Sequence, residues 1–185
     1  MIGVQDLRKG TTYTEDNELW RVLDYQHIKA GRGNATIRVK VRNVRTGATM
    51  EKTYPSGSRV QDVRLDHAEV QYLYHDGDLY TFMNTETFEQ PILHKDMLGD
   101  AIYFLTDGMT VDLESYEGEP ISVTLPTTVD LEVIETEPGF AGDTATNATK
   151  PASVSTGYQV KVPLFVNIGD KIRIDTRTGE YVTRV

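Results

Sequence analysis

The stretch LWRVLDYQHIKAGRGNATIRVKVRNV (residues 19–44) decides the fold. Residues 19–28 and 36–44 alternate apolar and polar side chains with a period of two, which is typical of a β-strand with one buried face. Gly31 and Gly33 lie between these two runs, and glycine permits the backbone conformations that a tight turn needs. The sequence therefore predicts a β-hairpin that holds Arg32 at its tip.

The rest of the chain repeats the β pattern in short segments separated by turns. Asp76-Gly77 separates two alternating runs, and an Asp-Gly pair in that position is a strong hairpin signal. We expect further strands in residues 47–54, in three segments of 63–93 broken at Asp76-Gly77 and Asn84-Thr85, in 109–126 with a hairpin at Glu117-Gly118, and in 127–136, 158–166, 170–176 and 180–185. One short or broken helix is expected in 94–105, and a long loop in 137–157. Many short strands with frequent turns predict an all-β fold made of small barrels.

Charge divides the chain into three parts. Residues 1–64 carry 12 Lys and Arg against 7 Asp and Glu, residues 65–126 carry 1 against 13, and residues 127–185 carry 6 against 8. The net charges are thus +5, −12 and −2, within a total of −9. We predict three modules with these boundaries, which pack on one another because a module of about 60 residues is near the lower limit for an independent core.

This asymmetry suggests that the first module meets phosphate groups and that the second stays away from them. The alternative is that the acidic stretch only confers solubility. The chain has no cysteine, no signal-peptide pattern at MIGVQDLRKG and no run of about 18 apolar residues, which favours a cytoplasmic protein with no membrane contact.

Motifs for catalysis and metal binding are missing from the sequence. The histidines, His27, His67, His75 and His94, show no metal-ligand spacing, and no phosphate-binding loop or nucleophile motif occurs. We therefore expect no metal, no cofactor and no enzymatic activity.

The strand after the tip carries the strongest binding signal. Arg38, Lys40 and Arg42 share one face of it, and such a row of like charge costs energy unless an anionic partner faces it. The alternative is a solvated strand face. Arg32 between its glycines offers a planar fork of N–H donors to phosphate or ribose oxygens, and the alternative there is a merely mobile turn.

Along its whole length the chain resembles bacterial translation elongation factor P. The tip segment Lys29 to Gly33 has the Lys-x-Gly-(Lys/Arg)-Gly form of the family, and residues 72–90 and 175–185 are similar to family segments. The most specific signature lies in KPASVSTGYQVKVPLFVNIG, where these residues fall at the family's spacings: Lys150, Ala152, Gly157, Val160, Val162, Pro163, Val166 and Gly169.

The resemblance implies an L-shaped mimic of transfer RNA, in which an SH3-like or KOW-like module precedes two OB-fold modules. It implies a monomeric factor that binds both ribosomal subunits between the peptidyl and exit sites, positions peptidyl-tRNA and stimulates peptide-bond formation, which relieves stalling at consecutive prolines. It also implies that the protein performs no covalent chemistry and that messenger RNA in the exit site is a further contact.

Site residues follow from the same resemblance. The tip residues Lys29, Gly31, Arg32, Gly33 and Asn34 would lie beside the acceptor end of the peptidyl-tRNA. Gly142, Asp143 and Thr144 would approach the exit-site codon, and Tyr181 and Arg184 the anticodon stem region. Family members often carry a β-lysylated lysine or a rhamnosylated arginine at the tip. Because Arg32 is followed by Gly33 rather than directly by Asn34, we expect Arg32 to be unmodified.

A generic single-stranded nucleic-acid-binding protein is the alternative function. Such a protein would stack bases on exposed aromatic side chains along a basic groove. The tyrosines that could serve, Tyr72, Tyr74 and Tyr80, lie in the module of net charge −12, so we expect them in the core or at a module interface.

Overall fold

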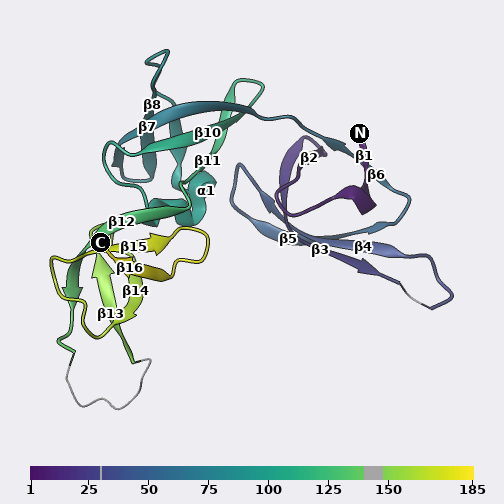
Figure 1. Cartoon of the computed structure of the whole chain (residues 1–185). Helices are drawn as coiled ribbons and strands as arrows, with labels where there is room; N and C mark the ends of the chain where they lie inside the picture. The colour runs from purple at the N-terminus through teal and green to yellow at the C-terminus, as the bar shows by residue number, and fades with distance from the viewer. Residues whose placement is uncertain (30, 140–147) are drawn as a thin grey trace.

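The computed structural model describes residues 1–29, 31–139 and 148–185, and it consists of three antiparallel sheets. Residues 2–62 form the first sheet, residues 66–124 the second and residues 128–184 the third, and each curls into a small barrel (Figure 1). We call these units the first, second and third module. The predicted all-β class made of small barrels is confirmed, and the second and third modules each contain a five-stranded sheet.

The first module is a six-stranded sheet in the order β1-β6-β2-β3-β4-β5. Its elements are β1 (Ile2–Gly3), the 3-10 helix η1 (Val4–Asp6), β2 (Thr12–Glu15), β3 (Glu18–Ile28), β4 (Thr36–Asn43), β5 (Thr49–Pro55) and β6 (Arg59–Asp62). The long strands β3 and β4 form the predicted hairpin, from Trp20 opposite Asn43 to Ile28 opposite Thr36. Alternate residues of β4 (Ile37, Val39 and Val41) are buried in the core, as the period of two requires.

The second module is a five-stranded sheet in the order β11-β10-β7-β8-β9. Its elements are β7 (Asp66–Asp76), β8 (Leu79–Asn84), β9 (Ile92–His94), α1 (Lys95–Leu98), η2 (Gly99–Tyr103), β10 (Thr110–Tyr116) and β11 (Glu119–Thr124). The helical segment is short and broken, as predicted. Tyr72 and Tyr80 are buried with Phe82 and Leu93, whereas Tyr74 is 55% exposed, so the expectation that all three tyrosines lie in the core or at a module interface is wrong for Tyr74. A β-bulge between Tyr72 and Tyr74 accounts for this difference.

The third module is a five-stranded sheet in the order β14-β13-β12-β15-β16. Its strands are β12 (Thr128–Thr136), β13 (Thr149–Val154), β14 (Gln159–Pro163), β15 (Lys171–Asp175) and β16 (Tyr181–Arg184). The expected loop over 137–157 is therefore wrong from Thr149 to Val154, because β13 pairs with both β12 and β14. Small residues and Pro151 hide the strand in the sequence, yet Ala152 and Val154 are buried in the core.

The modules pack on one another. Leu19 and Val44 of the first module are buried in one cluster with Ile121 of the second. Phe104 of the second module is buried in the core of the third, where its ring lies 5.1 Å from that of Tyr158. The first and third modules extend from the second in different directions (Figure 1).

Among the residues that the structure describes, no helix has both the length and the apolar composition needed to cross a membrane.

Candidate functional site

The tip of the β3–β4 hairpin projects from the first module (Figure 1). Lys29 and residues 31–34 are exposed, and residue 30 lies outside the described residues. Gly31 has a φ of 29°, and a Cβ there would meet nothing within 4 Å. Within the described part of the chain, no side-chain hydrogen bond or ion pair holds Lys29 or Arg32. The arrangement thus presents two cationic side chains at the end of a long, well-paired hairpin.

Strand β4 carries further cations behind the tip. Arg38 and Lys40 are exposed, because the residues between them point into the core. Lys40 lies opposite Asp24 of β3 and Glu51 of β5, so carboxylates flank it on both neighbouring strands. Arg38 lies opposite Gln26 and a threonine, which are uncharged. Arg38 therefore has the less compensated charge of the two.

Arg42, the third cation of the predicted row, lies at the joint between the first and second modules. Its Nη2 donates to the carbonyl oxygen of Asp96 at 2.8 Å. Two glycines leave room for this contact: a Cβ on Gly47 would lie 2.6 Å from that oxygen, and one on Gly99 would lie 2.5 Å from Nη1 of Arg42. Arg42 therefore links the first module to the second. A partner at the hairpin face would meet Arg38 and Lys40.

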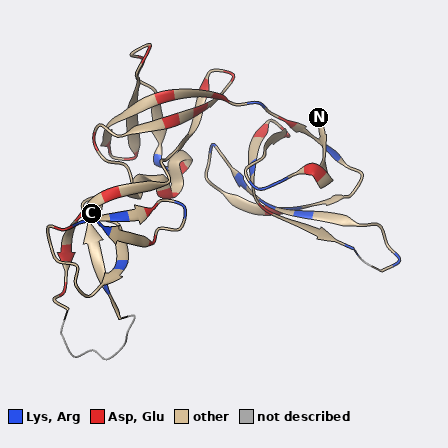
Figure 2. Cartoon of the chain, in the orientation of Figure 1, with Lys and Arg blue, Asp and Glu red and all other residues tan. Residues whose placement is uncertain are grey.

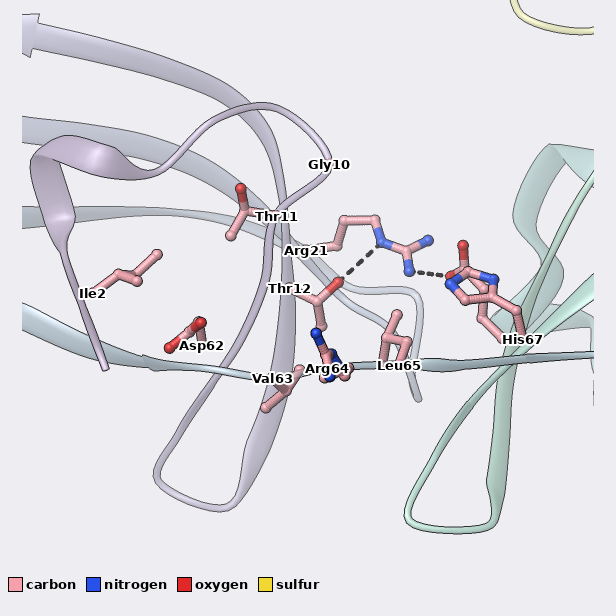
Figure 3. Close-up of a pocket in the computed structure, with 11 residues that line it drawn as sticks. Ile2, Gly10, Thr11, Thr12, Arg21, Asp62, Val63, Arg64, Leu65 and His67 are labelled. Carbon is pink, nitrogen blue, oxygen red and sulfur yellow. Dashed lines mark hydrogen bonds and ion pairs between the residues drawn. The ribbon is translucent and has the colours of Figure 1, made fainter.

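A second arginine crosses the same joint. Arg21 of β3 pairs with the carboxylate of Glu114 on β10, and its Nη1 donates to the hydroxyl of Ser122 at 3.3 Å. Glu114 also accepts from Ser122 at 2.8 Å and from Thr124 at 3.0 Å. Figure 3 shows Arg21 extending from the first module toward the carboxylate beside His67. Burial acts to raise the pKa of Glu114, but the charge of Arg21 and the hydroxyl donors outweigh it and hold that pKa below its usual value.

Arg45 makes the third link across the joint. Its guanidinium donates to both carboxylate oxygens of Glu119 at 3.1 Å each, a bidentate geometry. The sequence reasoning did not predict that Arg21 and Arg45 contact the second module. The charges in the sequence do favour such contacts, because a first module of net charge +5 precedes a second module of −12 and opposite charges attract (Figure 2).

A pocket beside this joint is lined by both modules, including Thr12, Arg21, Asp62, Leu65 and His67 (Figure 3). His67 Nδ1 lies 2.6 Å from Asp112 Oδ2, and this hydrogen bond raises the pKa of His67. Ligand atoms of His67, Asp112 and Glu114 lie within 4.8 Å of one another, as in a metal site. Since Arg21 already neutralises Glu114, the group is better suited to an ion-pair network than to a cation.

A polar cluster supports the base of the hairpin from inside the first module. Tyr54 donates to Glu15 at 2.7 Å and lies 3.0 Å from the hydroxyl of Tyr13. Lys52 pairs with the same carboxylate and lies 4.3 Å from the ring centroid of Trp20. Burial raises the pKa of Tyr13 to about 12, and burial together with the neighbouring Tyr13 and Glu15 raises the pKa of Tyr54. The cluster is therefore neutral or ion-paired at physiological pH.

In the third module, Tyr181 and Arg184 lie on the same strand, β16. Tyr181 is opposite Ile174 and Arg184 opposite Ile172, with a register shift between Arg173 and Ile174. Tyr181 is half-buried against the core of the third module, whereas Arg184 is exposed. The guanidinium of Arg184 lies 5.0 Å from the ring centroid of Phe165 and 3.6 Å from Asp170. Gly142, Asp143 and Thr144 lie outside the described residues.

Comparisons with known proteins cover all three modules. The model "Elongation factor P (EF-P) KOW-like domain" matches residues 3–60, "Elongation factor P (EF-P) OB domain" matches 65–123, and "Elongation factor P, C-terminal" matches 129–184. These matches confirm the expected order of a KOW-like module followed by OB-type barrels.

Relatives agree with the family models. A curated protein named Elongation factor P, from Thermoanaerobacter sp. (strain X514), is 52% identical over 185 residues, which is 100% of both chains. The solved structure "Eukaryotic translation initiation factor 5A from Methanococcus jannaschii" covers 67% of this chain and 91% of its own, with a TM-score of 0.53 and 24% identity, a likeness that shows the fold alone. The chain belongs to the elongation factor P family of translation factors.

Proposed function

We propose that this factor binds the ribosome between the peptidyl and exit sites, positions the peptidyl-tRNA and stimulates peptide-bond formation at consecutive prolines. Membership of the family supports a role in translation, and the exposed hairpin tip supports the site of action. The proposal includes both ribosomal subunits as partners, a monomeric state in the cytoplasm and an unmodified Arg32.

The observation that carries the proposal is the position of Arg32. It stands at the end of a hairpin with no partner among the described residues, while Arg21, Arg42 and Arg45 are engaged at the base. A guanidinium can hold phosphate or ribose oxygens without giving up a proton. Placing the reacting end of a tRNA correctly contributes orientation, which is worth roughly 7–11 kcal/mol at the extreme. Arg32 therefore acts by positioning and not by acid–base chemistry.

Charge and shape fit a mimic of tRNA. The second module, with 13 acidic residues against 1 basic residue, would present an anionic surface where a tRNA presents phosphates. In the third module, Tyr181 and Arg184 lie on β16 and would meet the anticodon stem region. Gly142, Asp143 and Thr144 are proposed to approach messenger RNA in the exit site.

Generic binding of single-stranded nucleic acid is disfavoured. Tyr72 and Tyr80 are 3% and 8% exposed, so they cannot serve as stacking platforms. Tyr74 is exposed but stands in the acidic module.

A reconstituted translation system tests the proposal. The factor should accelerate synthesis on a message that encodes three consecutive prolines and leave a proline-free message unaffected. It should also co-sediment with ribosomes and fail to bind a naked oligonucleotide. Equal effects on both messages, or tight binding to the oligonucleotide, would count against the proposed role.

A further inference from the structure

Three turns, one in each module, share the same hydrogen bonds. They have the sequences NVRTGA (43–48), NTETFE (84–89) and DTRTGE (175–180). In each turn the amide of the first residue donates to the carbonyl of the sixth, at 2.8, 2.8 and 2.9 Å, and the amide of the fifth donates to the carbonyl of the first, at 2.8, 2.9 and 2.8 Å. The threonine hydroxyl at the fourth position accepts from the sixth amide at 3.3, 3.4 and 3.3 Å. The three turns are therefore one structural solution used three times.

The fifth residue of this turn has a positive φ, a conformation that favours glycine, and in one of the three turns this residue is not glycine. Gly47 and Gly179 have φ values of 80° and 75°, as expected for glycine. In the second module the position is Phe88, with a φ of 61°. A bulky residue in the left-handed region is a conformational outlier, and its side chain is strained against the following carbonyl.

Open space around a residue does not by itself explain a phenylalanine at a position of positive φ. A Cβ added to Gly10, Gly77 or Gly118, which all have positive φ, would also meet nothing within 4 Å, yet these positions are glycine. The other non-glycine residues with positive φ in the described ranges are Asp16, Asn17 and Glu117, which are small or polar. Phe88 is therefore the exception among the described positive-φ residues.

Burial of the Phe88 side chain does not offset this strain. Phe88 is 69% exposed, the highest fraction of any large hydrophobic side chain among the described residues. Residues 86–90 are all exposed, so the loop that joins β8 to β9 gives the ring no cover. Figure 1 shows the segment after β8 extending away from the other two modules. Strained and exposed aromatic side chains of this kind are found at binding sites.

The acidic surface around Phe88 indicates the kind of partner that this side chain would bind. Glu86 and Glu89 flank Phe88, and the module carries 13 carboxylates against 1 basic side chain. RNA phosphates would be repelled by this surface, whereas a protein face with lysine and arginine around an apolar pocket would be attracted. We propose that Phe88 inserts into an apolar pocket on a basic protein face of the ribosome, a proposal that rests on the proposed docking of this factor there.

Replacing Phe88 with glycine gives effects of opposite sign on stability and on binding. Phe88→Gly relieves the strained backbone, so the Tm should rise by about 2–4 °C. Ribosome affinity should fall about tenfold, because a central aromatic contact is lost. The matched control is Glu117→Gly, which relieves an exposed turn residue of the same module with a φ of 49° and should raise the Tm without weakening binding.

A photoreactive benzoylphenylalanine at position 88 identifies the partner on purified ribosomes. Attachment to a ribosomal protein is expected, and attachment to ribosomal RNA would overturn the proposal. If wild-type factor and Phe88→Gly bind ribosomes equally well, this inference fails while the proposed function stands. If the wild-type factor does not co-sediment with ribosomes, both fail together.

Discussion

Replacing Arg21 with alanine tests the joint between the first and second modules. In the structure the guanidinium of Arg21 pairs with Glu114 and donates to Ser122. The two charged side chains are only 24% and 12% exposed. Arg21→Ala therefore leaves a carboxylate largely shielded from water with no cation beside it.

The expected loss follows from what Glu114 retains. Removing one partner of a fully buried ion pair costs about 3–5 kcal/mol. Here Ser122 and Thr124 still donate to the carboxylate at 2.8 and 3.0 Å, so we expect Arg21→Ala to lower the free energy of unfolding by about 2–3 kcal/mol. Glu114→Gln should cost about 1–2 kcal/mol, since Arg21 can turn toward water. The double variant should cost about 1–2 kcal/mol less than the sum.

Urea unfolding measures this coupling, with the fluorescence of Trp20 as the probe. Trp20 is the only tryptophan of the chain, and it is 8% exposed in the core of the first module. Because the pKa of Glu114 is lowered in the folded protein, the ion pair stabilises fully above the ordinary value of 4.5, and its contribution is lost as the pH falls through the folded pKa. Additive single-variant costs at pH 7, or a coupling that does not decline in acid, would refute the reasoning.

Three further predictions concern the hairpin face, the polar cluster of the first module and the joint between the first and second modules. Arg38→Glu combined with Lys40→Glu should weaken ribosome binding and flatten its salt dependence, and unchanged affinity across a salt series would exclude this face from docking. Tyr54→Phe loses the bond to Glu15, so urea unfolding should show a loss of about 1–2 kcal/mol; full stability would mean that the polar cluster contributes nothing. Gly99→Ala places a Cβ 2.5 Å from a guanidinium nitrogen at a φ of 58°, so calorimetry should show a lower Tm, and an unchanged Tm would contradict the packing.

Local sequence rules predicted the strands that alternate and the turns that need glycine. Strand β4 is an example, because its buried side chains Ile37, Val39 and Val41 are β-branched and its exposed Arg38 and Lys40 are charged. Strand β13 was missed because its apolar face includes Ala152, a small side chain next to Pro151. Its strand conformation depends on pairing with β12 and β14, which no local pattern reports.

The candidate site also has features that local sequence predicts and features that depend on distant residues. The exposure of Arg32 at a turn could be predicted, since it depends on residues 28–36 alone. The role of Arg42 could not, because its acceptor is a backbone carbonyl of Asp96, more than 50 positions away. Likewise, the register shift that places Tyr181 opposite Ile174 and Arg184 opposite Ile172 has no signal in the local sequence.

Peptide-bond formation on a triproline message with Arg32 variants tests the central claim most directly. The assay is run at saturating factor, so that weaker docking cannot be mistaken for lost function. Arg32→Ala should still bind ribosomes, because the proposed docking involves surfaces of all three modules, but it should lose most of the acceleration. Arg32→Lys should be intermediate, because an ammonium cannot reproduce the planar fork of a guanidinium. If Arg32→Ala relieves the stall at the wild-type rate, the tip is only an exposed turn and the account is wrong.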